Sequence, residues 1–228
     1  GGDYSSRTAL YFRMLRLVKF ILPVLIFSAI IVGIFIVFMR KEENCINLTI
    51  VGDVMLSRGV EKYLKEEGYD YPYKNLKDIF LLDDLTVINL ECPITDYGRG
   101  ADKSSRIVFK AESENVAAMK NAGIDLCNLA NNHTMDYRSE GLLDTMTELN
   151  KGGIDFLGAG KDSKCDMNYI YEKDGFKIGI VAYTMFPPEG FVYNESKTTV
   201  NYLLEFGDLK TDRIKADLEN LNTDFKII

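Results

Sequence analysis

The chain has 228 residues, 46% of them hydrophobic, with 34 acidic and 27 Lys and Arg side chains and a net charge of −7. Residues 1–40 carry +4, so residues 41–228 carry −11. The acidic balance of residues 41–228 argues against nucleic acid or an anionic membrane surface as the partner of this region, and it is compatible with a cation-binding site. The length suffices for one core, and alternating strand-like and helix-like segments predict an α/β fold.

An uncharged apolar segment runs from Phe20 to Met39, about the length needed to cross a hydrocarbon core roughly 30 Å thick. We therefore predict a transmembrane anchor over residues 20–40. Basic side chains are concentrated before this segment, which places residues 1–19 in the cytoplasm and residues 45–228 outside, in a single-pass protein of the cell membrane. A cleaved signal peptide is the alternative, but its apolar region is normally only about 7–15 residues long.

The first strand-like run, residues 46–53, ends in a Gly-Asp pair, so Asp53 stands at the carboxyl end of a predicted strand. A carboxylate there can ligate a metal, and its alternative role is to brace the turn. A helix is predicted to follow, running through Glu67 with Ser57 as its N-cap. Arg58 is a candidate contact for an anionic substrate group, the alternative being a solvated arginine at the start of the helix.

Two further apolar runs end in the same way. Residues 85–91 form a predicted strand that Pro93 terminates, with Glu91 at its end. Residues 124–130 form another, followed at once by Asn131, Asn132 and His133, the only histidine of the chain. Because the carboxyl ends of parallel strands lie along one edge of a sheet, these side chains can converge with Asp53. Amide oxygens, carboxylates and imidazole are ligands for divalent metals, so we predict a metal site there rather than three unrelated capped turns.

The remaining segments are less informative. Elsewhere we predict strands over residues 106–111, 154–157 and 177–183, helices over residues 114–121, 141–150 and 211–221, and the opening of a strand at residues 224–228. The four cysteines lie far apart and lack the close pairs of a zinc site. Cys127, inside an apolar strand, is expected to be a small buried hydrophobe.

Several of these segments together resemble the CapA family of capsule synthesis and poly-γ-glutamate biosynthesis proteins. The segments that carry the resemblance are Val51–Leu56, Asn89–Thr95, Phe109–Ala111, Asn128–Tyr137 and Gly158–Gly160. The resemblance implies a fold like that of calcineurin-like metallophosphoesterases, a sandwich of two sheets flanked by helices with a binuclear metal site at the strand ends.

The same resemblance implies roles for individual residues. Asp53 would be the first metal ligand, Glu91 the carboxylate that bridges two metals, and Asn132 a ligand of the second. His133 would be the catalytic general acid beside the leaving group. Asn131 joins Arg58 as a candidate substrate contact. The implied cofactor is a divalent metal, Mn, Zn or Mg, with as many as two ions in the full-length protein.

Two departures from these patterns bear on function. Typical metallophosphoesterases have a histidine two residues after the first aspartate, where this chain has Met55, a poor ligand for a hard metal. The His-Trp-Gly and Gly-His-x-Pro-His type motifs that follow in CapA-like proteins are also absent, since the sequence has no Trp and no histidine after His133. We therefore expect a C-terminally truncated domain, an incomplete sandwich that is inactive by itself.

Taken together, these features predict a membrane-anchored CapA-like protein for synthesis or export of capsule or poly-γ-glutamate, with a divalent-metal site of hydrolase type. Its expected partners are the membrane, polymer synthase subunits and an anionic polymer. Two alternatives stay open: a non-catalytic scaffold of an envelope-polymer synthesis complex, and a metal-dependent phosphoesterase that acts outside the cell.

Overall fold

The computed structural model describes residues 18–33, 45–162, 167–191, 198–203 and 208–228. Its internal contacts divide the chain into two units, residues 1–45 and 46–228. In the first unit, residues 18–33 are helical. Within the described ranges, no helix is both long enough and apolar enough to cross a membrane. The predicted anchor, residues 20–40, reaches past this helix into residues 34–40, which lie outside the described residues, as do residues 1–17.

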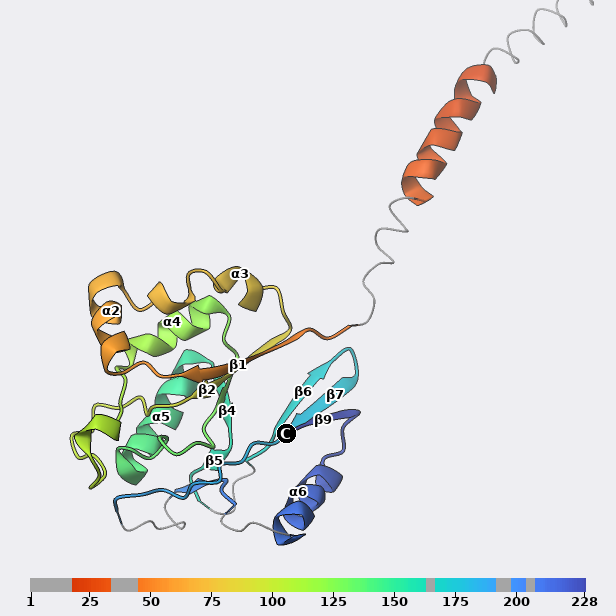
Figure 1. Cartoon of the computed structure of the whole chain (residues 1–228). Helices are drawn as coiled ribbons and strands as arrows, with labels where there is room; N and C mark the ends of the chain where they lie inside the picture. The colour runs from red at the N-terminus through yellow and green to blue at the C-terminus, as the bar shows by residue number, and fades with distance from the viewer. Residues whose placement is uncertain (1–17, 34–44, 163–166, 192–197, 204–207) are drawn as a thin grey trace, which may run out of the picture. The chain divides into compact units, whose positions relative to one another are not determined.

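The second unit is built on a four-stranded parallel sheet (Figure 1). Its strands are β1 (Leu48–Val54), β2 (Leu85–Leu90), β3 (Leu126–Asn128) and β4 (Asp155–Leu157), in that spatial order. The connections carry the helices α2 (Gly59–Glu67), α3 (Lys77–Phe80), α4 (Glu114–Ala122) and α5 (Arg138–Gly152) and the 3-10 turns η1 (Tyr71–Tyr73) and η2 (Ser105–Ile107). Strands and helices thus alternate along the chain, as the sequence predicts for an α/β protein.

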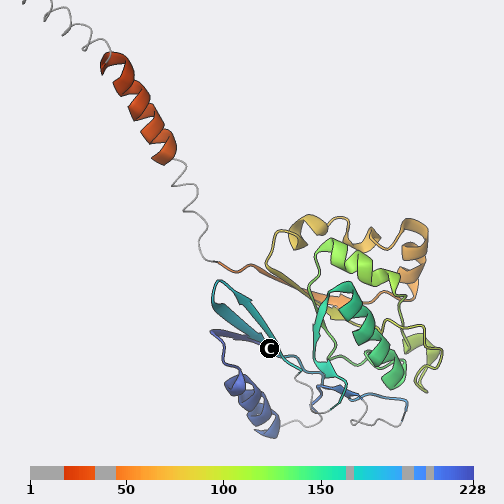
Figure 2. The same cartoon turned by 180° about the vertical axis from the view of Figure 1, so that it is seen from behind.

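Both faces of this sheet are buried, and β2 shows why its sequence is almost continuously apolar. Ile88 and Leu90 belong to the larger core, shared with α2, α4 and α5. Leu85 and Val87 belong to a second core on the opposite face, as the alternation of side chains along a strand requires. Turning the molecule by 180° shows the same order, with these helices on one side of the sheet and a second sheet on the other (Figure 2).

The second sheet contains β6 (Tyr169–Lys173), β7 (Phe176–Ile180) and β9 (Phe225–Ile227), with β7 between the other two. Its Ile178 and Ile180 pack with the second core. A short antiparallel pair, β5 (Ala159–Gly160) and β8 (Thr199–Val200), and the helix α6 (Asp208–Asn220) complete the described elements. The unit is therefore a layer of helices, a parallel sheet and a second sheet packed in that order.

Two helices end as their sequences predict. α4 and α5 close at Gly123 and Gly153, which have φ values of 96° and 68°, in the left-handed region that glycine adopts without strain. At each of these C-termini the cap backbone N–H donates to carbonyl oxygens of the last helical turn. The helix predicted over residues 141–150 is confirmed by α5, which begins three residues earlier, at Arg138.

Two local predictions are wrong. Residues 106–111 do not form a strand: η2 covers residues 105–107, and only an isolated bridge joins Ala111 to Ile94. Ser57 does not cap α2 with its side chain, because the helix begins one residue later, with Arg58 at the N-cap position and no side-chain cap bond. The Ser57 carbonyl oxygen instead accepts the N–H of Val60 at 3.2 Å.

Candidate functional site

Three strands of the parallel sheet bring polar side chains into one row. Asp53 of β1, Asn89 of β2 and Asn128 of β3 are partners in the sheet register, so their side chains lie on the same face. Asn89 Nδ2 donates to Asp53 Oδ1 at 2.8 Å, and Asn128 Nδ2 donates to Asn89 Oδ1 at 3.1 Å. The row lies at the carboxyl end of the sheet, where open α/β sheets bind ligands.

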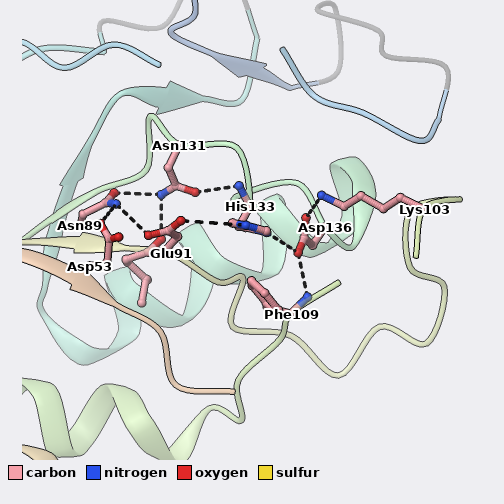
Figure 3. Close-up of polar contacts among 9 residues, drawn as sticks. Asp53, Asn89, Glu91, Lys103, Phe109, Asn131, His133 and Asp136 are labelled. Carbon is pink, nitrogen blue, oxygen red and sulfur yellow. Dashed lines mark hydrogen bonds and ion pairs between the residues drawn. The ribbon is translucent and has the colours of Figure 1, made fainter. Parts of the chain in front are cut away.

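The Asn89 amide connects this row to two more segments. Asn89 Nδ2 also lies 3.4 Å from Glu91 Oε2, just past the end of β2, and Asn89 Oδ1 accepts from Asn131 Nδ2 at 3.1 Å (Figure 3). All four hydrogen-bonding positions of this amide are therefore used. Asn131 also donates to the Leu90 carbonyl at 2.9 Å, and its Oδ1 accepts the backbone N–H of His133 at 3.0 Å. The strand ends thus hold Asp53, Glu91 and the histidine loop together.

The two carboxyl groups of the site influence each other's ionisation. The hydrogen bond from Asn89 lowers the pKa of Asp53, and a hydrogen bond with Glu91 lowers it further. Burial raises the pKa of Glu91 to about 7, and the hydrogen bond with Asp53 and its charge add to this. Asp53 is therefore the ionised member of the pair and Glu91 holds a proton near neutrality. A cation bound beside Asp53 and Glu91 would relieve the repulsion between the two carboxylates when both are ionised.

His133 is held by a buried carboxylate on the far side of its ring. Its Nδ1 lies 2.9 Å from Asp136 Oδ2, while its Nε2 is directed toward Glu91, 3.9 Å from Oε1 (Figure 3). An ionised carboxylate only accepts hydrogen bonds, so Nδ1 carries a proton and donates to Asp136. The distance from Nε2 to Glu91 is too long for a hydrogen bond, so within the described ranges Nε2 has no hydrogen-bond partner and can face a reacting group.

Asp136 itself is fully buried and has three partners. Its side chain is 0% exposed, and it forms an ion pair with Lys103 Nζ at 2.5 Å. Its Oδ2 also accepts the backbone N–H of Phe109 at 2.7 Å. The Phe109 ring packs against the His133 ring, with centroids 4.3 Å apart. Three segments of the chain therefore fix one imidazole in place.

The other two predicted site residues lie at the periphery. Arg58 is exposed and its guanidinium carbon lies over the Phe109 ring, 5.5 Å from the centroid. Asn132 is exposed as well, whereas its neighbour Asn131 is buried and bonded within the network. Of the predicted residues, the structure therefore brings Asp53, Glu91, Asn131 and His133 together, with Arg58 above the same aromatic ring as His133.

The donors of the site fit part of a divalent-metal shell. Asp53 and Glu91 supply the carboxylate oxygens that Mg²⁺ and Mn²⁺ prefer, and His133 supplies a nitrogen suited to Mn²⁺ or Zn²⁺. In the part of the chain that the structure describes, no three or more His, Cys, Asp and Glu side chains are grouped closely enough to hold a metal ion. The acidic pair is thus a partial ligand set.

Comparison with known families places this geometry in context. Residues 47–228 match the family described as "Bacterial capsule synthesis protein PGA_cap". The chain belongs to this family. The PGA_cap match begins one residue before β1 and includes every residue of the site described above.

Individual relatives support the PGA_cap assignment. The chain is 31% identical over 151 residues to the capsule biosynthesis protein CapA of Bacillus anthracis, an alignment that covers 64% of this chain and 36% of that protein. It is 30% identical over 153 residues to the PGA biosynthesis protein CapA of Bacillus subtilis, covering 66% and 40%. A probable polyglutamine synthesis accessory protein of Mycobacterium tuberculosis is 29% identical over 157 residues, covering 54% and 41%. This PGA_cap chain therefore spans well under half the length of the relatives it matches.

Among solved structures, the match to the NAD nucleotidase NadN of Haemophilus influenzae covers 70% of this chain and 30% of the NadN chain. The sequence identity is 18% and the TM-score 0.40.

Sequence reasoning missed four residues that organise this PGA_cap site. Asn89 and Asn128 occupy positions where a buried strand is otherwise apolar, which is an available sequence signal. Asp136 stands three residues after the only histidine, a spacing that places both on one turn. The role of Lys103 has no local signal, because its partner Asp136 lies 33 positions away in sequence and only the fold brings them together.

Proposed function

We propose that this protein acts in the synthesis or export of capsule or poly-glutamate, with Asp53 and Glu91 as ligands of a divalent metal at the end of the parallel sheet. The observation that carries the proposal is the adjacent carboxyl pair beside an oriented histidine, within a PGA_cap domain. The two-sheet core with helices outside fits the calcineurin-like metallophosphoesterase arrangement.

The proposed chemistry is hydrolytic or group-transferring. A divalent ion would supply Lewis acidity and lower the pKa of bound water. The chain's own contribution is positional: Asp53 and Glu91 would hold the ion, and Asn132, exposed at the periphery, is the further ligand that the family resemblance implies. Asp136 fixes the His133 ring through Nδ1; in the imidazolium form, which carries a second proton on Nε2, His133 would give that proton to a leaving group and return to the neutral ring. Arg58 would contact the substrate, whereas Asn131, the other predicted substrate contact, is buried and instead holds the histidine loop through its bonds to Asn89, Leu90 and His133.

The test uses the protein's gene in its own bacterium. Cell-bound and released polymer is measured, as glutamate freed by acid hydrolysis, in cells that carry the wild type, Asp53→Asn or His133→Ala. The three purified proteins are then assayed for hydrolysis of polymer and of phosphoester probes. Loss of hydrolysis in both variants supports a metal-dependent enzyme, with the preferred probe distinguishing a polymer hydrolase from a phosphoesterase. Normal polymer in both variants contradicts the proposal.

A second candidate is a non-catalytic scaffold that holds polymer synthase subunits or the polymer. It is favoured by the partial ligand set, because among the described residues no three His, Cys, Asp or Glu side chains are grouped closely enough to hold a metal ion, which leaves a catalytic shell incomplete. Binding of a synthase subunit that is lost in Asp53→Asn, with no hydrolysis by any form of the protein, would establish the scaffold.

The proposal also includes a membrane location, with residues 20–40 as a single anchor, residues 1–19 in the cytoplasm and the PGA_cap domain outside. The apolar composition of this segment and the basic residues before it support that orientation. Protease added to intact spheroplasts would digest the PGA_cap domain. Protection until the membrane is lysed would contradict the orientation.

A further inference from the structure

Arg58 has a backbone conformation that is strained for any residue except glycine. Its φ is 58° and its ψ is −125°, in the positive-φ region that side chains with a Cβ rarely adopt. Such strain persists where the surrounding structure imposes it, and it concentrates at ligand-binding and catalytic positions. The strained residue lies in the short connection between β1, which carries Asp53, and α2.

The Arg58 side chain reaches the ring that supports the histidine. The guanidinium lies over the Phe109 face, and the Phe109 ring contacts His133 at a centroid distance of 4.3 Å. Phe109 is 7% exposed and its N–H is bound by Asp136, so this platform is rigid. A guanidinium held over an aromatic face can still direct its N–H donors to a bidentate oxyanion.

The charge of Arg58 also distinguishes it from neighbouring cations. Lys103 is paired with buried Asp136, and Arg138 lies 3.0 Å from Asp102 Oδ2. Among the described residues, Arg58 forms no ion pair with a carboxylate, although residues 41–228 carry a net charge of −11. The side chain is exposed, so its positive charge is open to a ligand.

We propose that Arg58 is a specificity residue that binds an oxyanion of the substrate, a carboxylate or a phosphate, beside His133. This inference rests on the proposed function, because it assigns the substrate class of the same site. An anion-binding role explains why an arginine rather than a glycine has this strained conformation above the Phe109 ring that packs against His133. A residue that only braced the turn would need neither the charge nor the stacking.

The test measures anion binding to the full chain in detergent, by isothermal titration with tri-γ-glutamate and, separately, with inorganic phosphate, in saturating Mn²⁺. Arg58→Gln should weaken binding of the preferred anion by at least about tenfold, since a hydrogen bond to a charged group is lost. Arg58→Lys should recover part of the affinity. Arg106→Gln is the matched control: it removes an exposed arginine three residues before Phe109 and should change the affinity by less than about twofold.

A second variant separates binding from folding. Arg58→Gly removes the guanidinium and relieves the positive φ, so its melting temperature should not fall below that of Arg58→Gln, while anion binding is lost to the same extent. Equal anion affinities for Arg58→Gln and Arg106→Gln would overturn the proposal. So would an Arg58→Gly protein that binds anions as tightly as wild type.

The two probes identify the source of the oxyanion. Tighter binding of tri-γ-glutamate indicates the carboxylates of a polymer, and tighter binding of phosphate indicates a phosphoryl substrate. The double variant Asp53→Asn/Glu91→Gln removes the proposed metal ligands and their negative charge, so anion binding to Arg58 can be measured in it without Mn²⁺. Arg58-dependent binding in this background, combined with no Mn²⁺ binding by wild type, would refute the metal site while supporting the role of Arg58.

Discussion

The ion pair between Lys103 and Asp136 should contribute measurably to stability because it is buried. The Lys103 side chain is 12% exposed and that of Asp136 is 0% exposed. Removing one partner of a buried pair costs about 3–5 kcal/mol, since the remaining charge is left in a medium of low polarity. Asp136 keeps two other donors, His133 Nδ1 and the Phe109 N–H, so we expect Lys103→Met to lower the free energy of unfolding by about 2–3 kcal/mol.

Asp136→Asn should cost less, about 1–2 kcal/mol, because the amide oxygen can still accept a hydrogen bond and Lys103 is near enough to solvent to be hydrated. In the double variant the two losses should not add, with an interaction energy of about 1–3 kcal/mol. These values lie below the total stability of about 5–15 kcal/mol typical of a domain, so the variants should remain folded.

The assay is urea unfolding of the full chain in detergent, followed by circular dichroism and by fluorescence of its 13 tyrosines. Lys151→Met is the control, because Lys151 lies 2.7 Å from Glu148 in a pair whose lysine side chain is 66% exposed, and it should cost less than about 0.5 kcal/mol. Equal effects of Lys103→Met and Lys151→Met, or strictly additive losses at Lys103 and Asp136, would show that the buried Lys103–Asp136 ion pair does not contribute to stability as a coupled pair.

Two further predictions concern backbone fit and pH. Gly158 has φ +81°, and a Cβ there would lie 2.6 Å from Ala130 Cβ. Gly158→Ala should therefore lower the free energy of unfolding by at least about 2 kcal/mol more than Gly153→Ala, where φ is also positive but no atom lies within 4 Å of the added Cβ. Equal melting temperatures of the two variants would contradict this. In the metal-free protein the pKa of Glu91 is raised from 4.5 to about 7, so the folded state binds more protons than the unfolded state and stability should fall as pH rises from about 4.5 to about 7. Asp53→Asn removes the neighbouring charge and should reduce that slope in part, because burial, the largest cause of the raised Glu91 pKa, remains. The slope is measured by urea unfolding at several pH values, and an unchanged slope would show that the charge of Asp53 does not contribute to it.

The elements predicted correctly are those whose signals are local. β2 and β4 follow short apolar runs, and α4 and α5 end at Gly123 and Gly153, where left-handed backbone is needed. The strand predicted within residues 224–228 is confirmed by β9 (Phe225–Ile227). A local turn signal was overlooked: Asp174 and Gly175 both have positive φ and join β6 to β7 as a hairpin.

The predictions that failed depended on distant partners. Residues 106–111 have strand-like composition, but the Phe109 N–H is bound by the Asp136 side chain, and the Ala111 N–H by the Pro93 carbonyl, so no continuous ladder forms. The convergence of Asp53, Glu91 and the histidine loop could be predicted because parallel strands place their carboxyl ends on one edge. The orientation of each side chain could not, since Asn89 connects them through bonds to three other segments.

Titration of Mn²⁺ into the metal-free full chain in detergent tests whether Asp53 and Glu91 form a divalent-metal site. We expect saturable binding that Asp53→Asn weakens at least about tenfold. Glu66→Gln, a control at a side chain that is 54% exposed in α2, should bind as wild type does. Absence of saturable Mn²⁺ binding in wild type, or equal affinity in Asp53→Asn, would contradict the proposed metal site.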